Sequence, residues 1–255
     1  MAVDRVRVVL VEPQHPGNVG AVARAMANFG LDQLVLVAPP AWDPHRARWA
    51  APGCDALIAN ARVVDTLDEA LDGVHHVVAS TARHRKQGQP VIDPPTFAEA
   101  VCASDTTWAV LFGREDNGLP ASAVDRAERV LRIPTASHAS LNLAQAALIV
   151  CQAVFLAATD GGTQAPGRAV GGRTQTQTAK LDHRPRAVAD VVALEALVTH
   201  AVGLLERVGY TRGTSPEQVA VTLRSALQRA ELAPHEVDAL RGMVARVDRA
   251  RTPGA

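Results

Sequence analysis

Residues 133–145 read IPTASHASLNLAQ, and they open a long apolar run at residues 144–158. Three small polar side chains, Ser140, Asn142 and Gln145, stand where a helix is expected to begin. Taken alone, Ser140 and Asn142 are most simply interpreted as helix caps, because short polar side chains accept hydrogen bonds from the first amides of a helix. Packing alone would favour aliphatic side chains at these positions, so it does not explain the choice of three polar residues.

Upstream of this stretch, short β-branched runs alternate with helical patterns. Strands are expected at residues 6–11, 34–37, 63–64, 76–80, 108–112 and 130–133, and helices at 19–29, 55–61, 67–71, 97–103 and 121–127. This alternation predicts an α/β fold with a parallel sheet and crossover helices. The strands are nearly continuous apolar runs, which is typical of a sheet with helices on both faces. Thr66-x-x-Glu69 and Thr96-x-x-Glu99 predict two helix starts as capping boxes.

Downstream, the amino-acid composition changes to mostly Gly, Thr, Gln and Pro, which predicts a flexible linker at residues 161–186. Residues 161–189 carry five cations against Asp182 alone. Helical periodicity returns at 188–208, 215–230 and 234–249, where Ser215-Pro216 is a typical N-cap followed by proline. The expected organisation is therefore a domain at 1–160, a basic linker at 161–186 and a helical extension at 187–255.

The composition limits the classes of function. The 255 residues have an apolar fraction of 47% and a formal net charge of zero, so any positive potential for nucleic acid must be local. The N-terminus has no long apolar run, which predicts a cytoplasmic protein without a membrane anchor. Cys54, Cys102 and Cys151 are far apart, and no spacing of His, Cys, Asp or Glu matches a metal site, so neither a disulfide framework nor a metal is expected.

Polar residues and glycines follow three of the expected strands, where open α/β sheets bind ligands. Asn18, Gly20 and Arg24 follow the first strand; Gly113, Glu115 and Gly118 follow the strand at 108–112; the third segment is 133–145. Simpler interpretations stay open: Asn18 as a helix cap, Arg24 as a solvated arginine and Glu115 as a turn residue. The first segment lacks G-x-G-x-x-G and G-K-[ST], which disfavours a dinucleotide oxidoreductase and a phosphate-binding loop.

Taken together, the three segments resemble the ordered motifs of the SpoU (TrmH-type) RNA 2'-O-ribose methyltransferases of the SPOUT superfamily. The motifs are Asn18-x-Gly20-x-x-x-Arg24, Gly113-x-Glu115-x-x-Gly118 and Ile133-Pro134 with Ser140-Leu141-Asn142. The likeness is greatest to the TrmJ subgroup, because residues 9–12 and 64–71 recur there and a helical extension follows a linker. It covers almost the whole chain, more loosely after Thr159. The sequence departs from many relatives at Ala136-Ser137, where they carry glycine.

The resemblance implies a C-terminal trefoil knot in the α/β domain and a homodimer that binds S-adenosyl-L-methionine. The implied cofactor contacts are Ser80, Thr81, Ala82, Gly113, Ile133, Ser140, Leu141 and Asn142. Arg24 is implied as the residue that acts on the ribose 2'-hydroxyl, and the other implied catalytic residues are Asn18, Glu115, Ser140 and Asn142. The implied RNA contacts are Arg83, Arg85 and Lys86, together with Arg224, Arg229, Arg241, Arg246 and Arg249 of the extension.

The expected function is therefore tRNA 2'-O-methylation at nucleotide 32 of the anticodon loop, on cytidine or uridine. A ribose hydroxyl is a weak nucleophile, so a positioned group must orient it or receive its proton. Two alternatives remain open: methylation of ribosomal RNA by an enzyme of the same family, and a non-catalytic RNA-binding protein that keeps the fold. Intact Asn18, Arg24, Glu115 and Asn142 disfavour the second alternative.

Overall fold

The computed structural model describes residues 2–83, 89–137, 139–160 and 188–251. Among these residues, seven strands form one sheet in the order β3-β2-β1-β6-β4-β7-β5, and every neighbouring pair is parallel. The strands are β1 (Val6–Val11), β2 (Gln33–Val37), β3 (Arg62–Val64), β4 (His76–Ser80), β5 (Val91–Ile92), β6 (Trp108–Phe112) and β7 (Arg129–Leu131). The predicted α/β class with a parallel sheet is confirmed.

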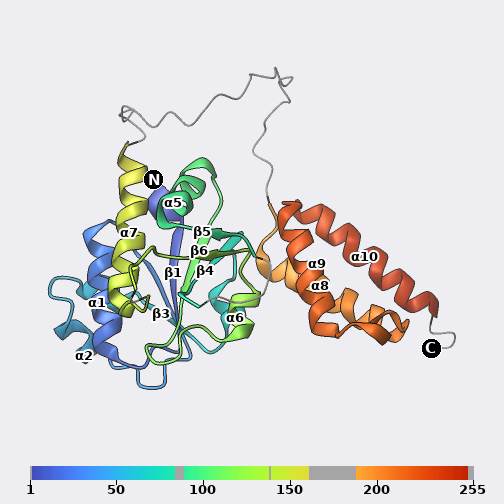
Figure 1. The fold of residues 1–255 in the computed structure, drawn as a ribbon, viewed down its shortest axis with the longest axis horizontal. Helices are drawn as coiled ribbons and strands as arrows, with labels where there is room; N and C mark the ends of the chain where they lie inside the picture. The colour runs from blue at the N-terminus through green and yellow to red at the C-terminus, as the bar shows by residue number, and fades with distance from the viewer. Residues whose placement is uncertain (1, 84–88, 138, 161–187, 252–255) are drawn as a thin grey trace, which may run out of the picture.

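Helices cover both faces of the sheet, which explains the continuous apolar strands (Figure 1). In β1, Val8 and Leu10 pack into the core of one face, whereas Val9 and Val11 pack into the core of the other. The first face is covered by α1 (Pro16–Asn28), α2 (Pro44–Trp49), α3 (Asp55–Ala59), α5 (Pro94–Ala103) and α7 (Leu143–Asp160). The second is covered by α4 (Leu67–Ala70) and α6 (Ala121–Asp125). A trefoil knot in this domain stays a prediction.

The two predicted capping boxes have different outcomes. Thr66 caps α4 as predicted, since its hydroxyl accepts from the Glu69 amide at 3.2 Å. The box at Thr96 is wrong, because α5 begins two residues earlier, at Pro94. Its N-cap is Asp93, whose carboxylate accepts from the Thr96 amide at 2.9 Å. An aspartate followed by proline is the stronger start signal, and it places Thr96 inside the first turn.

The described C-terminal part forms three helices, α8 (Val191–Arg207), α9 (Pro216–Arg229) and α10 (Pro234–Arg251), with a 3₁₀ turn at Tyr210–Gly213 between α8 and α9. A second 3₁₀ turn, at Ala2–Arg5, precedes β1. Ser215 caps α9 as predicted, accepting from the Gln218 amide at 3.2 Å. The three helices share a small core that includes Leu194, Leu197 and Val237. The linker expected at 161–186 lies outside the described residues.

The start of α8 contacts the α/β domain directly, and α8 and α9 lie beside α6 in Figure 1. Val191 is buried in the core of the second sheet face, and its amide donates to the Val74 carbonyl at 2.9 Å. Arg126, at the end of α6, pairs with Asp68 of α4 and with Glu195 of α8, the latter at 3.5 Å. Arg224 of α9 also binds Glu195, through two hydrogen bonds of 2.7 and 2.8 Å. We call Arg126, Asp68, Glu195 and Arg224 the docking cluster.

Candidate active site

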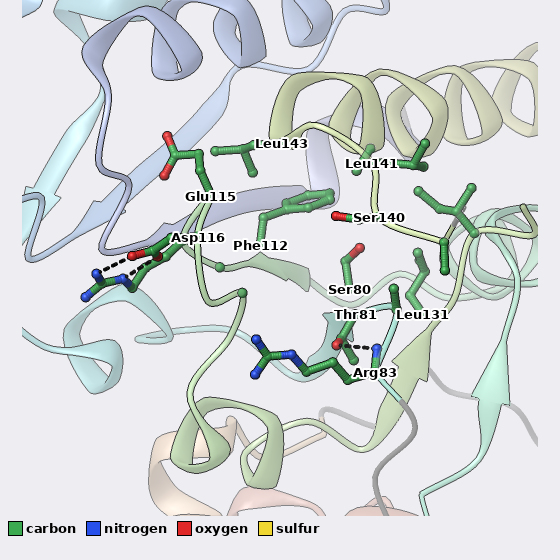
Figure 2. A pocket seen from close by; sticks show the side chains of 17 residues that line it. Ser80, Thr81, Arg83, Phe112, Glu115, Asp116, Leu131, Ser140, Leu141 and Leu143 are labelled. Atoms are coloured by element: carbon green, nitrogen blue, oxygen red, sulfur yellow. Dashed lines mark hydrogen bonds and ion pairs between the residues drawn. The ribbon is translucent and has the colours of Figure 1, made fainter. Parts of the chain in front are cut away.

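A cavity of about 330 Å³ opens at the carboxyl edge of the sheet, where the loops after β4, β6 and β7 meet the start of α7 (Figure 2). Its wall combines polar loop residues with apolar side chains from the strand ends. The lining residues are Ser80, Thr81, Ala82, Arg83, Phe112, Gly113, Arg114, Glu115, Asp116, Gly118, Leu131, Ile133, Ala139, Ser140, Leu141, Leu143 and Ala146. A concave site with an apolar body and a few convergent polar groups is typical of small-molecule and cofactor sites.

The loop after β6 folds back tightly on itself. A Cβ atom on Gly113 would collide with the backbone of Gly118 and Leu119, and Gly118 has a φ of +60°. The Gly118 amide donates to the Arg114 carbonyl at 2.9 Å, which closes the turn. Glycine at 113 is therefore required by the close approach of the loop's own backbone.

Arg114 fixes this loop to the neighbouring strand end. Its guanidinium donates to both carboxylate oxygens of Asp116, at 2.9 and 2.8 Å, and to Glu12 after β1 at 3.2 Å. Hydrogen bonding from Arg114 lowers the pKa of Asp116 to about 2, and the same bonds raise the pKa of Arg114 above its usual value. Both groups therefore stay charged across the physiological pH range.

Glu115 points away from the centre of the cavity and toward the start of α1 (Figure 2). Its carboxylate accepts hydrogen bonds from the amides of Gln14 at 2.8 Å and His15 at 3.2 Å, and from the Asn18 side chain at 2.8 Å. Burial alone would raise the pKa of Glu115, but these hydrogen bonds outweigh it and hold that pKa below the ordinary value. Glu115 is thus an ionised acceptor with both oxygens in use.

Asn18 does not cap α1, so the interpretation of this residue as an N-cap is wrong. The N-cap is His15, which makes no side-chain cap, and Pro16 takes the first helical position. Asn18 lies in the first turn and donates to Glu115. The Glu115 carboxylate, 97 residues further along the chain, accepts from the Asn18 side chain and from the amide of the N-cap residue His15.

The start of α7 forms the opposite wall. Asn142 caps this helix, because its side-chain oxygen accepts from the Ala144 amide at 2.9 Å. The Gln145 side chain accepts from the Asn142 amide at 3.3 Å, and together they form a reciprocal cap. Ser140 lies two residues earlier and lines the cavity, into which its hydroxyl points (Figure 2). The polar residues of this stretch thus divide into a helix cap and a cavity wall.

Both parts of the chain match known families. Residues 5–152 match the SpoU rRNA Methylase family, and residues 192–254 match the C-terminal domain of tRNA methyltransferase TrmJ. The chain belongs to the SpoU methylase family.

Relatives in this family match almost end to end. The chain is 35% identical to the tRNA (cytidine/uridine-2'-O-)-methyltransferase TrmJ of Cronobacter sakazakii, over 97% of this chain and 98% of that protein. It is 34% identical to the TrmJ of Escherichia coli O6:K15:H31, over 96% of both chains. Among solved structures, TrmJ from Z. mobilis ZM4 superposes with a TM-score of 0.78 and 31% identity, covering 95% of this chain and 98% of that one. A probable methylase family protein from Haemophilus influenzae Rd KW20 superposes with a TM-score of 0.60 and 29% identity, covering 97% of this chain and 97% of that one.

The structure brings together most of the cofactor contacts that the SpoU resemblance implies. Seven of the eight line the cavity: Ser80, Thr81, Ala82, Gly113, Ile133, Ser140 and Leu141. The eighth, Asn142, caps α7 just outside the lining. The lining also includes Phe112, Leu131 and Leu143, which sequence patterns do not separate from ordinary core residues. Arg114 and Asp116 were missed too, although their spacing after a strand end was a usable signal.

Not all of the implied catalytic and RNA-binding residues lie at the cavity. Arg24 is exposed on α1, does not line the cavity of its own chain, and makes no hydrogen bond or ion pair within the described residues. Arg83 lines the cavity, whereas Arg85 and Lys86 lie outside the described residues. Arg224 is held in the docking cluster by Glu195, and its expected role as an RNA contact stays a prediction. No helix in the described part of the chain is long and apolar enough to cross a membrane.

Proposed function

We propose that this protein is an S-adenosylmethionine-dependent tRNA methyltransferase that acts as a homodimer on the ribose 2'-hydroxyl of nucleotide 32, cytidine or uridine, in the anticodon loop. The observation that carries the proposal is the likeness to TrmJ proteins over both the methylase domain and the C-terminal domain. A likeness confined to residues 5–152 would support only an RNA methyltransferase of some kind.

The cavity has the chemistry that the proposed cofactor needs. Leu131, Ile133 and Leu141 offer an apolar surface for a flat heterocycle, and the loops at 80–83 and 113–118 offer polar groups for its charged ends. When bound, S-adenosylmethionine would supply an electrophilic methyl group. The volume of about 330 Å³ is at the lower end of the range for such ligands, so we expect the loops to adjust on binding.

Arg24 is proposed to orient the 2'-hydroxyl and to offset the negative charge that develops on its oxygen. A guanidinium group holds its proton tightly, so arginine is a poor base. Glu115 is an equally poor candidate, because both its oxygens already accept hydrogen bonds from α1 and the loop before it. Holding the hydroxyl in line with the methyl group can supply roughly 7 to 11 kcal/mol, so positioning is expected to be the main contribution of the chain.

A homodimer would explain why Arg24 lies away from the cavity of its own chain. Along α7, from Leu143 to Thr159, there is no charged residue, and an exposed stripe includes Leu148, Phe155 and Leu156. Phe29 of α1 contacts Phe155 at a ring-centroid distance of 5.7 Å, so the stripe continues onto α1. A second copy that covers this surface would bring α1 of one protomer toward the partner's cavity, and each cavity would receive Arg24 from the other chain.

The C-terminal helices are proposed to bind the tRNA body. Arg241 and Arg246 on α10 are exposed and pair with no acidic residue in the described part of the chain, and Arg229 on α9 bonds only to Ser225, at 2.7 Å. With Arg83 at the cavity, they provide local positive charge on a protein of zero net charge. Phosphate contacts of this kind release counterions, so affinity for tRNA should fall steeply between 50 and 200 mM salt.

The test is to incubate the protein with methyl-labelled S-adenosylmethionine and bulk tRNA, and then to map the labelled nucleoside. Wild type should label the ribose of nucleotide 32. The methylation rate of Arg24→Ala should be at least about 100-fold lower, as expected for loss of a group that aligns the reactants. Arg62→Ala is the matched control, because Arg62 begins β3 at the opposite edge of the sheet. No label in tRNA, label at another nucleotide, or equal rates for wild type and Arg24→Ala would each refute the corresponding part of the proposal.

A further inference from the structure

Glu12, the residue that follows β1, has a strained backbone conformation. Its φ is +50°, in the left-handed region, which costs free energy for most residues other than glycine. The Glu12 amide donates to the Val37 carbonyl at 2.9 Å, and the Glu12 carbonyl accepts from the Gln14 side chain at 2.6 Å. The Glu12 carboxylate accepts from Arg114 at 3.2 Å. Of these three bonds, only the one with Arg114 depends on the Glu12 side chain.

Arg114 joins Glu12 to the loop that lines the cavity. The same guanidinium holds both carboxylate oxygens of Asp116, at 2.9 and 2.8 Å, and Figure 2 shows these two bonds at the edge of the cavity. We call the contacts of Arg114 with Glu12 and Asp116 the Arg114 bridge. The bridge connects the loop after β6 to the end of the neighbouring strand β1.

The Arg114 bridge and Glu115 hold the two ends of one segment. Residues 12–18 run from the end of β1 into the first turn of α1. Arg114 binds Glu12 at the start of this segment, and Glu115 accepts hydrogen bonds from three groups nearer the helix. Two adjacent residues of the cavity loop therefore fix the segment that leads into the helix carrying Arg24.

We propose that Arg114 is a positioning residue for methyl transfer, which holds Glu12 in its strained conformation and so fixes the start of α1 relative to the cavity loop. This inference rests on the proposed function. Without the bridge, Glu12 can relax toward the extended conformation that continues β1, and residues 12–18 would shift. A misplacement of about 1 Å can lower the rate of a reaction about 100-fold. The position of Arg24 in the partner's cavity depends on how α1 is held in its own chain.

The first experiment measures the single-turnover rate of methyl transfer at saturating tRNA and S-adenosylmethionine, and separately the affinity for each. Arg114→Ala should lower the rate about 10- to 100-fold and leave both affinities within about threefold of wild type, because a positioning residue acts on alignment. Arg48→Ala is the matched control, since Arg48 is 36% exposed, against 32% for Arg114, and pairs with Asp55 on α3. It should keep the wild-type rate. A normal rate in Arg114→Ala, or a loss of affinity with a normal rate, would overturn the proposal.

Glu12→Gly separates positioning from folding. Glycine adopts a φ of +50° without strain, so this variant should keep a thermal midpoint close to that of wild type and yet lose rate as Arg114→Ala does. Ala38→Gly is its matched control, because Ala38 follows β2 with a φ of +42° and has no carboxylate to form a bridge. It should keep the wild-type rate. The double variant of Glu12→Gly and Arg114→Ala should be no slower than the slower single variant. A normal rate in Glu12→Gly, or losses that multiply in the double variant, would show that Arg114 does not act through Glu12.

Hydrogen exchange tests the bridge without reference to activity. The amides of Glu12, Gln14 and His15 all donate hydrogen bonds, so their exchange reports how firmly the segment is held. Exchange at these amides should be faster in Arg114→Ala than in wild type, whether or not methyl transfer occurs. A wild type that labels no tRNA, together with faster exchange in the variant, would refute the proposed function and support the hold of Arg114 on residues 12–18. Equal exchange in the two proteins would overturn the inference.

Discussion

The Asn18 side chain donates a hydrogen bond of 2.8 Å to the carboxylate of Glu115, across 97 residues of sequence. Asn18 lies in the first turn of α1, and Glu115 lies in the loop that lines the cavity. This bond, with those from Gln14 and His15, joins the helix that carries Arg24 to the proposed cofactor loop. Both residues are therefore better described as positioning residues than as groups that exchange a proton.

Glu115→Gln should destabilise the protein by about 1 to 3 kcal/mol at pH 7, because the amide cannot accept hydrogen bonds at both of its terminal atoms. Since the pKa of Glu115 is lowered from its ordinary 4.5 in the folded protein, its contribution is complete above that value and is lost as pH falls through the lower, folded pKa. Urea unfolding of both proteins from pH 7 to pH 3 measures the difference, which should shrink in acid. Glu99→Gln, an exposed site on α5, should show no difference, and a gap for Glu115→Gln that is constant with pH would contradict this account.

Gly20 and Gly17 of α1 form a matched pair that tests the crossing of α1 and α2, where a Cβ atom on Gly20 would collide with the Ala47 carbonyl group. Gly20→Ala should destabilise the protein by about 1 to 3 kcal/mol, because the new methyl group must displace the backbone of α2. Gly17→Ala has no atom within 4 Å of its new methyl group and should be neutral or stabilising by up to about 1 kcal/mol, since alanine restricts the unfolded chain. Thermal unfolding measures both. Equal effects of the two substitutions would mean that the crossing is not rigid.

Most elements of this fold are readable from the sequence, including the short helices α3, α4 and α6, whereas α2 and β5 are not. The apolar strands and the helices α1, α5 and α7 carry enough periodicity to be predicted. Helix α2 has six residues and strand β5 has two, so neither shows a period. The start of α5 was misplaced because two valid cap signals, Asp93-Pro94 and Thr96, compete within four residues.

The candidate site follows the same division between local and long-range signals. Polar residues at strand ends predicted the cavity, because all parallel strands end at one edge of the sheet. The partner of Glu115 could not be predicted, since a carboxylate in a glycine-flanked loop gives no sign that its donors lie 97 to 101 residues earlier. The docking of α8 was equally hidden, because Val191 looks like any other core residue of a helix.

Arg126 of the docking cluster should couple the C-terminal helices to the α/β domain. Its side chain is only 12% exposed and reaches both Asp68 and Glu195, and its backbone carbonyl accepts from Gln228 at 3.2 Å. The acidic partners are not buried, since Asp68 is 60% and Glu195 21% exposed, so losing these pairs should cost about 1 to 3 kcal/mol, less than for a fully buried pair. Arg126→Ala should therefore destabilise the protein by about that amount and let the C-terminal helices be cleaved off by trypsin at low protease concentration.

Arg207→Ala is the control for the docking cluster, since Arg207 pairs with Asp248 within the C-terminal helices and is half exposed. That substitution should change stability by about 1 kcal/mol or less. Limited proteolysis and thermal unfolding of both variants measure the contrast. If Arg126→Ala is digested no faster than Arg207→Ala, the apolar contact of Val191 must hold the helices without help from the docking cluster.

Leu148 belongs to the exposed stripe of α7, and 41% of its surface is accessible in the single chain. Burying a carboxylate there without a partner would be costly, so Leu148→Asp should convert the proposed dimer into a monomer in light scattering. Because each cavity would then lack Arg24 from the other chain, methyl transfer should fall at least about 100-fold, as for Arg24→Ala. Met243→Asp on exposed α10 places the same charge elsewhere and should leave the dimer intact. A monomeric Leu148→Asp variant with full activity would show that Arg24 serves its own cavity and that the stripe has another role.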